Sequence, residues 1–321
     1  MSRSDRISIG IVGARGYVGG ELVRLVAGHP HLEIAFVSSR STAGQDVAAH
    51  VKGAPAGLQF SHLEATDVAA SVADVIILAL PNGEAIHYVA AIDASDRPDR
   101  VIVDVSADYR FDDGWVYGQP ERFRDCIRGA RRIANPGCYA TASQLAIAPL
   151  VDALRGPATV FGVSGYSGAG SAPCDKNNPE MLRDNLLPYS LVGHIHEREI
   201  ARHVGHPVHF LPHVAPFFRG ITVTVSMPLS RRLRVDEVAQ RYQQAYGGEP
   251  LIRLTGVTAP LVRDIADQHH VAIGGWCVSE RGDRAAAVAT IDNLLKGAAT
   301  QALQNVNLAC GLDELEGIAH G

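Results

Sequence analysis

The sequence has few lysines, no paired cysteines and no long apolar run. Lysine occurs only at Lys52, Lys176 and Lys296 among 29 basic residues. The five cysteines are widely spaced, without a Cys-x-x-Cys pair, which argues against a disulfide framework and against a zinc ribbon. The longest apolar run, Val75–Leu80, is far shorter than the ~20 residues that a membrane span needs, and residues 1–12 contain no apolar leader. We therefore expect a cytoplasmic protein with reduced thiols.

Neither sign of charge dominates the chain. The formal net charge is −5, from 29 basic and 34 acidic residues without a long run of either, so binding to nucleic acid or to a membrane surface is not indicated. Hydrophobic residues make up 46% of the 321 residues, as in folded proteins, and this length usually divides into two domains. The expected partners are a small-molecule substrate and further copies of the chain, as a dimer or tetramer.

Two kinds of pattern follow one another along the chain. In the first 136 residues, β-branched runs alternate with helical patterns, as in parallel βαβ units; the expected strands are Ile7–Val12, Ile34–Val37, Val75–Ala79 and Val101–Val105. Later, a mostly antiparallel sheet with helices on one face is predicted from strand patterns at Ile221–Met227, Val271–Ile273 and Ala286–Thr290 and helical patterns at Val235–Tyr246 and Leu294–Leu308.

The fold class that these patterns predict is α/β. A Rossmann-type domain with a parallel sheet is expected at residues 1–136, and a C-terminal helix at 301–321 returns to it. An α+β catalytic domain with a mixed, largely antiparallel sheet is expected at residues 137–300.

Three glycines follow the first expected strand. Gly13, Gly16 and Gly19 are spaced Gly-x-x-Gly-x-x-Gly, and the helical pattern after them ends at Gly28 and Pro30. Glycines at such a turn let backbone amides approach a pyrophosphate at the helix N-terminus. A flexible surface turn is the alternative. The strand before the glycines and the helix after them favour a dinucleotide-binding loop.

The end of the second expected strand indicates which dinucleotide is bound. An enzyme that uses NAD carries an acidic residue there for the ribose 2′-hydroxyl, whereas this chain has Ser38, Ser39, Arg40 and Ser41. These side chains suit a 2′-phosphate, so NADP is the expected cofactor. Arg40 as a solvated surface charge is the alternative.

Two common enzyme classes lack their motifs here. No lysine lies four residues after a tyrosine, as short-chain reductases require, and neither Ser164 nor Ser167 stands in Gly-x-Ser-x-Gly. The remaining candidate nucleophile is Cys138, which follows Pro136-Gly137 at the start of an alanine-rich helical pattern. Helix amides at that position favour a thiolate.

The other cysteines are expected to have no part in the chemistry. A small thiol that fills a core is the ordinary role of cysteine, and we expect it of Cys126, Cys277 and Cys310. Cys174 stands in a polar stretch and is expected to be exposed.

The stretch from Asn135 to Pro149, Asn-Pro-Gly-Cys-Tyr-Ala-Thr-Ala-x-x-x-Ala-Ile-x-Pro, resembles the active-site signature of the N-acetyl-gamma-glutamyl-phosphate reductase family, within the aspartate-semialdehyde dehydrogenase superfamily. The resemblance covers almost the whole chain. Further blocks match in the family's order: Gly13–Gly19, Leu80-Pro81, Ser106–Arg110, Val163–Gly170, Arg219-Gly-Ile and Ile291–Ala299.

This resemblance implies a reaction and the residues that carry it. Cys138 attacks an acyl phosphate, phosphate leaves, and hydride from NADPH reduces the resulting thioester to the aldehyde while an imidazole handles protons. His194 takes the catalytic role and His196 supports it, although which of the two transfers the proton stays open. No metal is implied. A metal site at the His-x-His pair is the alternative, but no carboxylate or cysteine spacing completes it.

The block around His194 departs from the family at two positions. Ile195 replaces an arginine and Arg198 replaces a proline. If the missing guanidinium assists substrate binding in the family, either Arg198 compensates for it or recognition has changed.

The resemblance also assigns binding residues. Arg110, Asn135, Arg219 and Glu199 are the expected substrate contacts, since a guanidinium binds phosphate or carboxylate with two parallel hydrogen bonds; surface ion pairs are the alternative for both arginines. The expected cofactor contacts are Gly13, Arg15, Gly16, Tyr17, Val18, Ser38, Ser39, Arg40, Leu80, Pro81, Ser167, Gly168 and Asn293. A plain helix N-terminus explains Asp292-Asn293 equally well.

The expected function is therefore the NADPH-dependent reduction of N-acetyl-gamma-glutamyl phosphate to the semialdehyde, in arginine biosynthesis. One alternative is a reductase of aspartyl phosphate or of a carrier-linked aminoadipyl phosphate. Another is a protein that senses NADPH without catalysis. The N-acyl group of the substrate and the oligomeric state stay open.

Overall fold

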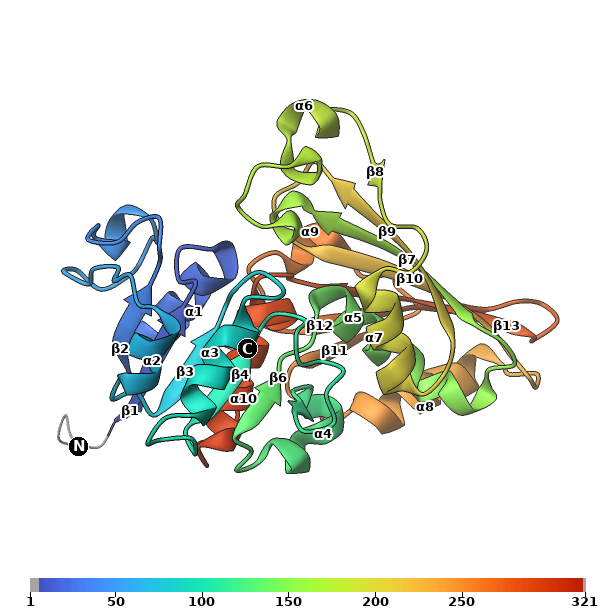
Figure 1. Ribbon diagram of the computed structural model, residues 1–321. Helices are drawn as coiled ribbons and strands as arrows, with labels where there is room; N and C mark the ends of the chain where they lie inside the picture. The colour runs from blue at the N-terminus through green and yellow to red at the C-terminus, as the bar shows by residue number, and fades with distance from the viewer. Residues whose placement is uncertain (1–5, 320–321) are drawn as a thin grey trace. The chain divides into compact units, whose positions relative to one another are not determined.

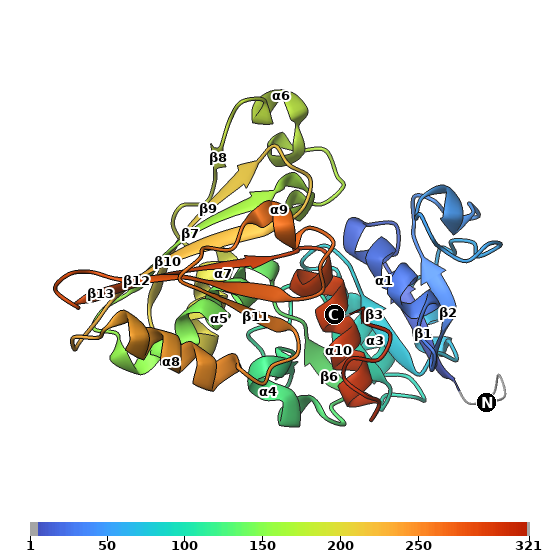
Figure 2. The same cartoon turned by 180° about the vertical axis from the view of Figure 1, so that it is seen from behind.

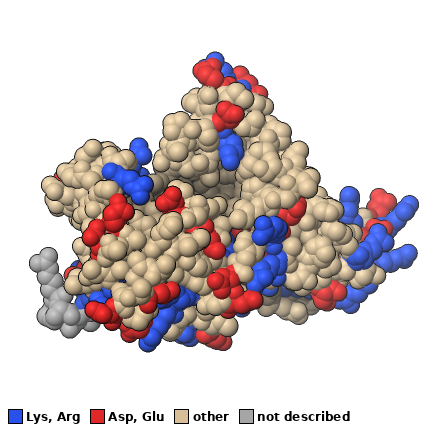
Figure 3. Space-filling view, viewed as in Figure 1, with Lys and Arg blue, Asp and Glu red and all other residues tan. Residues whose placement is uncertain are grey.

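The computed structural model describes residues 6–319, which form two compact units. The first unit comprises the chain up to Pro136 together with Ala298–Ala319, and the second comprises Gly137–Gly297. Residues 1–5 and 320–321, which belong to the expected first domain, lie outside the described residues. Within residues 6–319, no helix has the length and apolar character needed to cross a membrane. Basic and acidic side chains are interspersed over the face shown in Figure 3.

The first unit contains a six-stranded sheet in which every pair of neighbours is parallel. Its strands are β1 (Ile7–Val12), β2 (Leu32–Ser38), β3 (Val75–Leu78), β4 (Val101–Asp104), β5 (Val116–Tyr117) and β6 (Arg132–Ala134), in the spatial order β2-β1-β3-β4-β6-β5. All four strands predicted for this region are confirmed, with ends shifted by at most two residues. β1 lies between β2 and β3, so the strand order reverses there, which is where α/β sheets bind ligands.

The helices of this unit surround a continuously apolar sheet. They are α1 (Tyr17–Ala27), α2 (Ala65–Ala70), α3 (Ala85–Asp93), α4 (Pro120–Ile127) and α10 (Thr300–Ala309). Strand β3 reads Val-Ile-Ile-Leu and is buried at every residue, as expected where helices cover both faces of a parallel sheet. The predicted Rossmann-type fold is confirmed.

The second unit contains a seven-stranded mixed sheet. Its strands are β7 (Ala158–Gly165), β8 (Leu187–Pro188), β9 (Val208–Ala215), β10 (Ile221–Pro228), β11 (Ile252–Gly256), β12 (Val271–Val278) and β13 (Arg284–Ile291), in the order β11-β12-β13-β10-β7-β9-β8. The pairs β7–β9 and β11–β12 are parallel and the others antiparallel. The predicted mixed, largely antiparallel sheet is thus confirmed.

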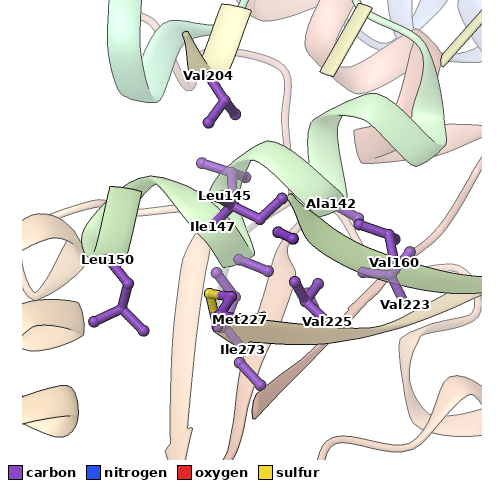
Figure 4. Packing of buried hydrophobic residues seen from close by; sticks show 14 of the residues in the cluster. Ala142, Leu145, Ile147, Leu150, Val160, Val204, Val223, Val225, Met227 and Ile273 are labelled. Atoms are coloured by element: carbon purple, nitrogen blue, oxygen red, sulfur yellow. The ribbon is translucent and has the colours of Figure 1, made fainter. Parts of the chain in front are cut away.

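Helices α5 (Cys138–Ile147), α7 (Ile195–Val204) and α8 (Val235–Tyr246) pack on this sheet. The unit also contains two short helices, α6 (Pro179–Leu182) and α9 (Val262–Ile265). Helix α5 contacts β10, β13 and α7, while α8 contacts β11 and β12 (Figures 1 and 2). Figure 4 shows Ala142 of α5 beside Val160 and Val223 of the sheet. Because α5 is apolar or small nearly all round, it forms the buried centre of the unit.

The predicted helix from Leu294 to Leu308 is not a uniform α-helix. Leu295–Ala299 form a π-helical turn, which leads into α10. A Cβ atom on Gly297 in this turn would lie 2.7 Å from the Cβ of Cys138. The wide turn and the glycine therefore bring the backbone directly against the cysteine, and turns of this kind are frequent at functional sites.

Candidate functional site

The glycine loop lies where the strand order reverses. Gly13 adopts a φ of +82°, and a Cβ atom there would overlap the carbonyl group of Ala79 at the end of β3. The amides of Gly13 and Ala14 both donate to Ser38 O at the end of β2, at 3.0 and 3.1 Å. Leu80 is within 3.4 Å of the same hypothetical Cβ atom. The loop thus joins the carboxyl ends of β1, β2 and β3, which only glycine permits.

The start of α1 is suited to an anionic group. Its N-cap is Gly16, which offers no side chain to the first turn, and that turn contains no acidic residue. A Cβ atom on Gly19 would overlap Gly13 O and Ala14, so the helix packs closely on the loop. The partial positive charge of the helix N-terminus is therefore available to a phosphate. This glycine cradle fits the pyrophosphate of a dinucleotide.

The residues after β2 differ in how accessible they are. Ser38 and Ser39 are buried; Ser38 Oγ accepts from the Leu63 amide at 3.2 Å, and Ser39 Oγ accepts from Thr42 Oγ1 at 2.7 Å. Arg40 is exposed next to them. The serines thus hold the turn in shape, and the guanidinium of Arg40 is the group that a 2′-phosphate could approach.

Cys138 is the first residue of α5 in the second unit. Gly137 is the N-cap, in extended conformation, and its carbonyl accepts the first helical hydrogen bond from Thr141 N at 2.8 Å. Cys138 is half-buried, while the next nine residues of α5 are buried. The helix N-terminus therefore points its partial positive charge at this thiol.

Two histidines at the start of α7 lie beside α5. His194 is the N-cap of α7, and its Nδ1 accepts from the His196 amide at 3.1 Å. The His196 ring lies 5.9 Å from the ring of Tyr139, the residue after Cys138. Burial lowers the pKa of His194, and the charge of Lys176 lowers it further. At neutral pH, a neutral imidazole is thus available to accept a proton.

A buried carboxylate connects the two helices. Glu199 has no exposed surface, and its Oε1 accepts from the Gly137 amide at 2.8 Å. Its Oε2 lies 4.0 Å from His196 Nε2. Glu199 therefore touches both the residue before the cysteine and one of the histidines. The sequence indicated a substrate contact for Glu199, and the structure places it fully buried between the start of α5 and His196.

Tyr189 is a site residue that the sequence did not single out. It follows β8, and its ring lies 5.5 Å from that of His194. Burial raises the pKa of its phenol, and the proximity of Cys138 raises it further. No motif marks this tyrosine, and the only sequence signal is its place five residues before His194.

Arg219 makes ion pairs within the second unit. Its Nε lies 2.7 Å from Asp292 Oδ2, its Nη1 pairs with Asp267, and its side chain is 12% exposed. Asp292 is fully buried and also accepts from the Leu294 and Leu295 amides, at 2.9 and 3.0 Å. Asp292 thus caps the turn that follows it, as the helix N-terminus alternative expects, and it orients Arg219.

Asn293 connects two parts of the same unit. Its Oδ1 accepts from the Gly220 amide at 2.8 Å, and its Nδ2 donates to Ser167 Oγ at 2.9 Å. A Cβ atom on Gly168 would lie 2.8 Å from Ser164 Oγ. The structure therefore brings Asn293, Ser167 and Gly168 together, as the resemblance expects.

Arg110 and Asn135 lie inside the first unit. The Nε of Arg110 donates to Asn135 O at 2.9 Å and its Nη2 to Val105 O at 2.8 Å, and the residue is 8% exposed. Asn135 is fully buried and accepts from Asn305 Nδ2 at 2.9 Å. The surface ion pair considered for Arg110 is therefore wrong, because the residue is buried.

Two expectations about the remaining cysteines are also wrong. Cys126 and Cys277 were expected in a core, but both are exposed: Cys126 lies on the amphipathic helix α4, and Cys277 follows a register shift in β12. Cys310 is half-buried, and burial raises its pKa to about 11. Cys174 is exposed, as expected. Among residues 6–319, no three His, Cys, Asp or Glu side chains are grouped to hold a metal ion.

Family models cover most of the chain. Residues 8–130 match the NAD binding domain of semialdehyde dehydrogenase, and residues 138–293 match the semialdehyde dehydrogenase dimerisation domain.

Curated relatives are similar over nearly their full length. An N-acetyl-gamma-glutamyl-phosphate reductase of Xanthomonas oryzae pv. oryzae is 57% identical, over 97% of this chain and 98% of the relative. The protein of the same name from Stenotrophomonas maltophilia is 55% identical over 98% of both chains.

Solved structures share the fold at low sequence identity. Aspartate semialdehyde dehydrogenase II from Vibrio cholerae is similar with a TM-score of 0.76 and 20% identity, over 95% of this chain and 99% of that one. An aspartate semialdehyde dehydrogenase with NADP from Candida albicans has a TM-score of 0.68 and 16% identity, over 95% and 99%.

Proposed function

This chain belongs to the N-acetyl-gamma-glutamyl-phosphate reductases of the semialdehyde dehydrogenase family, and we propose that it reduces N-acetyl-gamma-glutamyl phosphate with NADPH, releasing phosphate and N-acetylglutamate semialdehyde in arginine biosynthesis. One observation carries the proposal. Cys138 begins the buried helix α5, and α7, which starts with His194 at its N-cap and contains His196, contacts α5 in the same unit.

The first half-reaction is acyl transfer to sulfur. The Cys138 thiolate attacks the carbonyl carbon of the acyl phosphate, and the bond from that carbon to the phosphate oxygen breaks. Phosphate leaves and a thioester remains. The N-terminus of α5 favours the thiolate at the start of this step, because its amides point toward the sulfur.

The second half-reaction reduces the thioester. The dihydronicotinamide of NADPH, when bound, supplies the hydride. His194, protonated when it takes the thiol proton of Cys138 before the first half-reaction, donates that proton to the carbonyl oxygen to give the thiohemiacetal. It accepts the proton again as the carbon–sulfur bond breaks, which releases the aldehyde and the Cys138 thiolate. The lowered pKa of His194 suits this exchange near neutral pH.

We assign cofactor binding to the first unit. Gly13, Arg15, Gly16, Tyr17 and Val18 would hold the pyrophosphate at the start of α1. Ser38, Ser39 and Arg40 would lie at the 2′-phosphate. Leu80 and Pro81, which follow β3, would contact the cofactor as well. Ser167, Gly168 and Asn293 of the second unit would contact the nicotinamide end.

We assign substrate binding chiefly to arginine. Arg219, already oriented by Asp292, has the planar guanidinium that suits an anionic group, and Arg110 and Asn135 form a second candidate set in the first unit. We further propose a cytoplasmic homo-oligomer, supported by the match to a dimerisation domain.

Steady-state assays with purified protein test the proposal. The catalytic efficiency is expected to be at least ~100-fold higher on N-acetyl-gamma-glutamyl phosphate than on aspartyl phosphate, since substrate groups left unpaired cost several kcal/mol. Higher efficiency on aspartyl phosphate, or on a carrier-linked aminoadipyl phosphate, would assign a sister reductase instead. NADPH binding without turnover of any acyl phosphate would assign a sensor.

The cofactor assignment has its own test. Replacing Arg40 with Ala should raise the KM for NADPH about tenfold, the effect of one lost charge-assisted contact, and leave the KM for NADH unchanged. An equal or higher efficiency with NADH in the unmodified protein would contradict the assignment.

A further inference from the structure

A lysine lies next to the catalytic histidines, in a part of the chain that the proposed mechanism does not use. Residues 171–193, hereafter the 171–193 segment, connect β7 and its following turn to α7 and contain α6 and β8 (Figure 1). Lys176 is half-buried in this segment, and its Nζ lies 4.8 Å from the centre of the Tyr189 ring. The Tyr189 ring in turn lies 5.5 Å from His194. A cation is thus stacked on the aromatic group beside the proton-transferring imidazole.

Separate hydrogen bonds fix the two ends of this contact. Around Lys176, the Asn177 side chain donates to Gly170 O at 2.9 Å and to Ala172 O at 2.7 Å. At the other end, the Tyr189 amide donates to Pro212 O at 3.2 Å, and β8 pairs with β9. Because each side of the contact is anchored to the backbone, the ammonium group is held at the site.

The residue between the two histidines carries no charge. It is Ile195, the first residue of α7. His194 faces Lys176 and Tyr189 of the 171–193 segment, Glu197, Glu199 and His196 of its own helix, and Phe210 of β9. Lys176 is the positive charge among these groups.

We propose that Lys176 binds an anionic group of the acyl-phosphate substrate beside His194. The inference rests on the proposed function for the identity of the substrate. An acyl phosphate presents a phosphoryl group, which leaves as an anion, and an ammonium group binds such a group as a point charge.

A protection experiment tests this without turnover. Iodoacetamide alkylates Cys138 at a rate that inorganic phosphate should reduce, and peptide mass analysis reports Cys138 separately from the exposed cysteines. In Lys176→Met, the phosphate concentration that halves the rate should rise about tenfold, the effect of one lost charge-assisted contact. Lys176→Arg should retain protection, and Lys52→Met, which removes an exposed lysine of the first unit, should match the unmodified protein.

Kinetics then separate binding from structure. Lys176→Met should raise the KM for the acyl phosphate about tenfold, with kcat and the KM for NADPH little changed. Because Lys176 lowers the pKa of His194, the acid limb of kcat/KM should move to higher pH in this variant. Lys176→Arg, which keeps the positive charge, should keep the KM for the acyl phosphate close to that of the unmodified protein.

Each outcome has one meaning. Equal phosphate protection in Lys176→Met and in the unmodified protein overturns the inference. Protection that is lost in Arg198→Met but kept in Lys176→Met would mean that Arg198 binds the anion. Lost protection in Lys176→Met, in a protein that does not reduce N-acetyl-gamma-glutamyl phosphate, would uphold the lysine site and reject the proposed substrate.

Discussion

Helices α1 and α5 begin alike but face different surroundings. Each follows a strand of the parallel sheet, and each has an extended glycine at its N-cap, Gly16 with φ −61° and ψ 160° and Gly137 with φ −72° and ψ 149°. At α5, the Gly137 amide donates to the buried carboxylate of Glu199. At α1, the Gly16 amide donates instead to the backbone carbonyl of Gly13, at 3.1 Å.

This difference shows how one local motif serves two kinds of chemistry. A glycine at the N-cap leaves the helix N-terminus accessible to a negative group in both cases. The residue at the first helical position and the group that the N-cap amide contacts then decide which chemistry the helix start supports. At α1, Tyr17 follows an N-cap whose amide donates to backbone, which suits a bound phosphate. At α5, Cys138 follows an N-cap whose amide donates to a buried carboxylate, which suits a thiolate that must also act as a leaving group.

Cys138→Ser should have the largest effect and tests whether the start of α5 is catalytic. Serine preserves the shape but has a far weaker nucleophile, so kcat/KM should fall by about 10⁴-fold or more. Cys277→Ser, which changes an exposed cysteine of the same unit, should leave kcat/KM unchanged. If the Cys138 variant were nearly as active as the Cys277 variant, the residue at the start of α5 would have no catalytic role.

Gly13→Ala tests the loop that leads into α1. The added methyl group would overlap the Ala79 carbonyl at a φ of +82°, so the free energy of unfolding should fall by about 4 kcal/mol. Gly44→Ala is the matched control, because Gly44 has a φ of +80° and open space around it; there the strain alone should cost about 1 kcal/mol. Urea denaturation measures both, and equal losses would show that the close approach of the loop is unimportant.

Asp104→Asn probes a buried carboxylate of the first unit, which contains the dinucleotide loop. Asp104 is fully buried at the end of β4, and burial raises its pKa to about 6. The folded protein therefore favours the protonated acid, so stability is highest below pH ~4 and falls as the pH rises through 6, by up to about 3 kcal/mol. Asparagine cannot ionise.

The measurement is urea denaturation between pH 4 and pH 7. The free energy of unfolding of Asp104→Asn, minus that of the unmodified protein, should increase by up to about 3 kcal/mol as the pH rises from 4 to 7. A difference that does not change with pH would show that Asp104 ionises normally.

Glu199→Gln should have the smallest effect of the four and tests the carboxylate behind Gly137. The side-chain oxygen of Gln can still accept from the Gly137 amide, but Gln carries no charge to stabilise a protonated His194. The value of kcat should therefore fall about tenfold. Because Glu199 raises the pKa of His194, the acid limb of the pH profile should move to lower pH.

Glu197→Gln is the matched control for that variant. Glu197 lies on the same helix, also raises the pKa of His194, and accepts from the Gly193 and Phe210 amides. It should shift the acid limb similarly, with kcat within a few-fold of the unmodified protein. An equal loss of kcat in both variants would mean that the Gly137 cap has no special importance.

The sequence predicted those parts of the fold that are set by local patterns. Strands such as β1 and β10 and the helix α8 were predicted almost to the residue, because their apolar periodicity and their glycine ends are properties of short stretches. The start of α5 at Cys138 was also predicted, since Pro136-Gly137 breaks the chain just before an alanine-rich run.

What the sequence could not predict depends on the tertiary fold. The burial of Glu199 follows from the packing of α7 on α5, and the exposure of Cys277 follows from a register shift in β12. The proximity of Lys176 to Tyr189 depends on the pairing of β8 with β9, which connects residues far apart in the sequence. No local pattern encodes such contacts.

The central claim is that the acyl group is carried on Cys138. Protein mixed with N-acetyl-gamma-glutamyl phosphate in the absence of NADPH, quenched in acid and digested, can be analysed by mass spectrometry. The account predicts that the peptide containing Cys138 gains the mass of one N-acetylglutamyl group, and that NADPH added before the quench removes it. Product formation with NADPH, without any adduct on Cys138 before NADPH is added, would contradict the account.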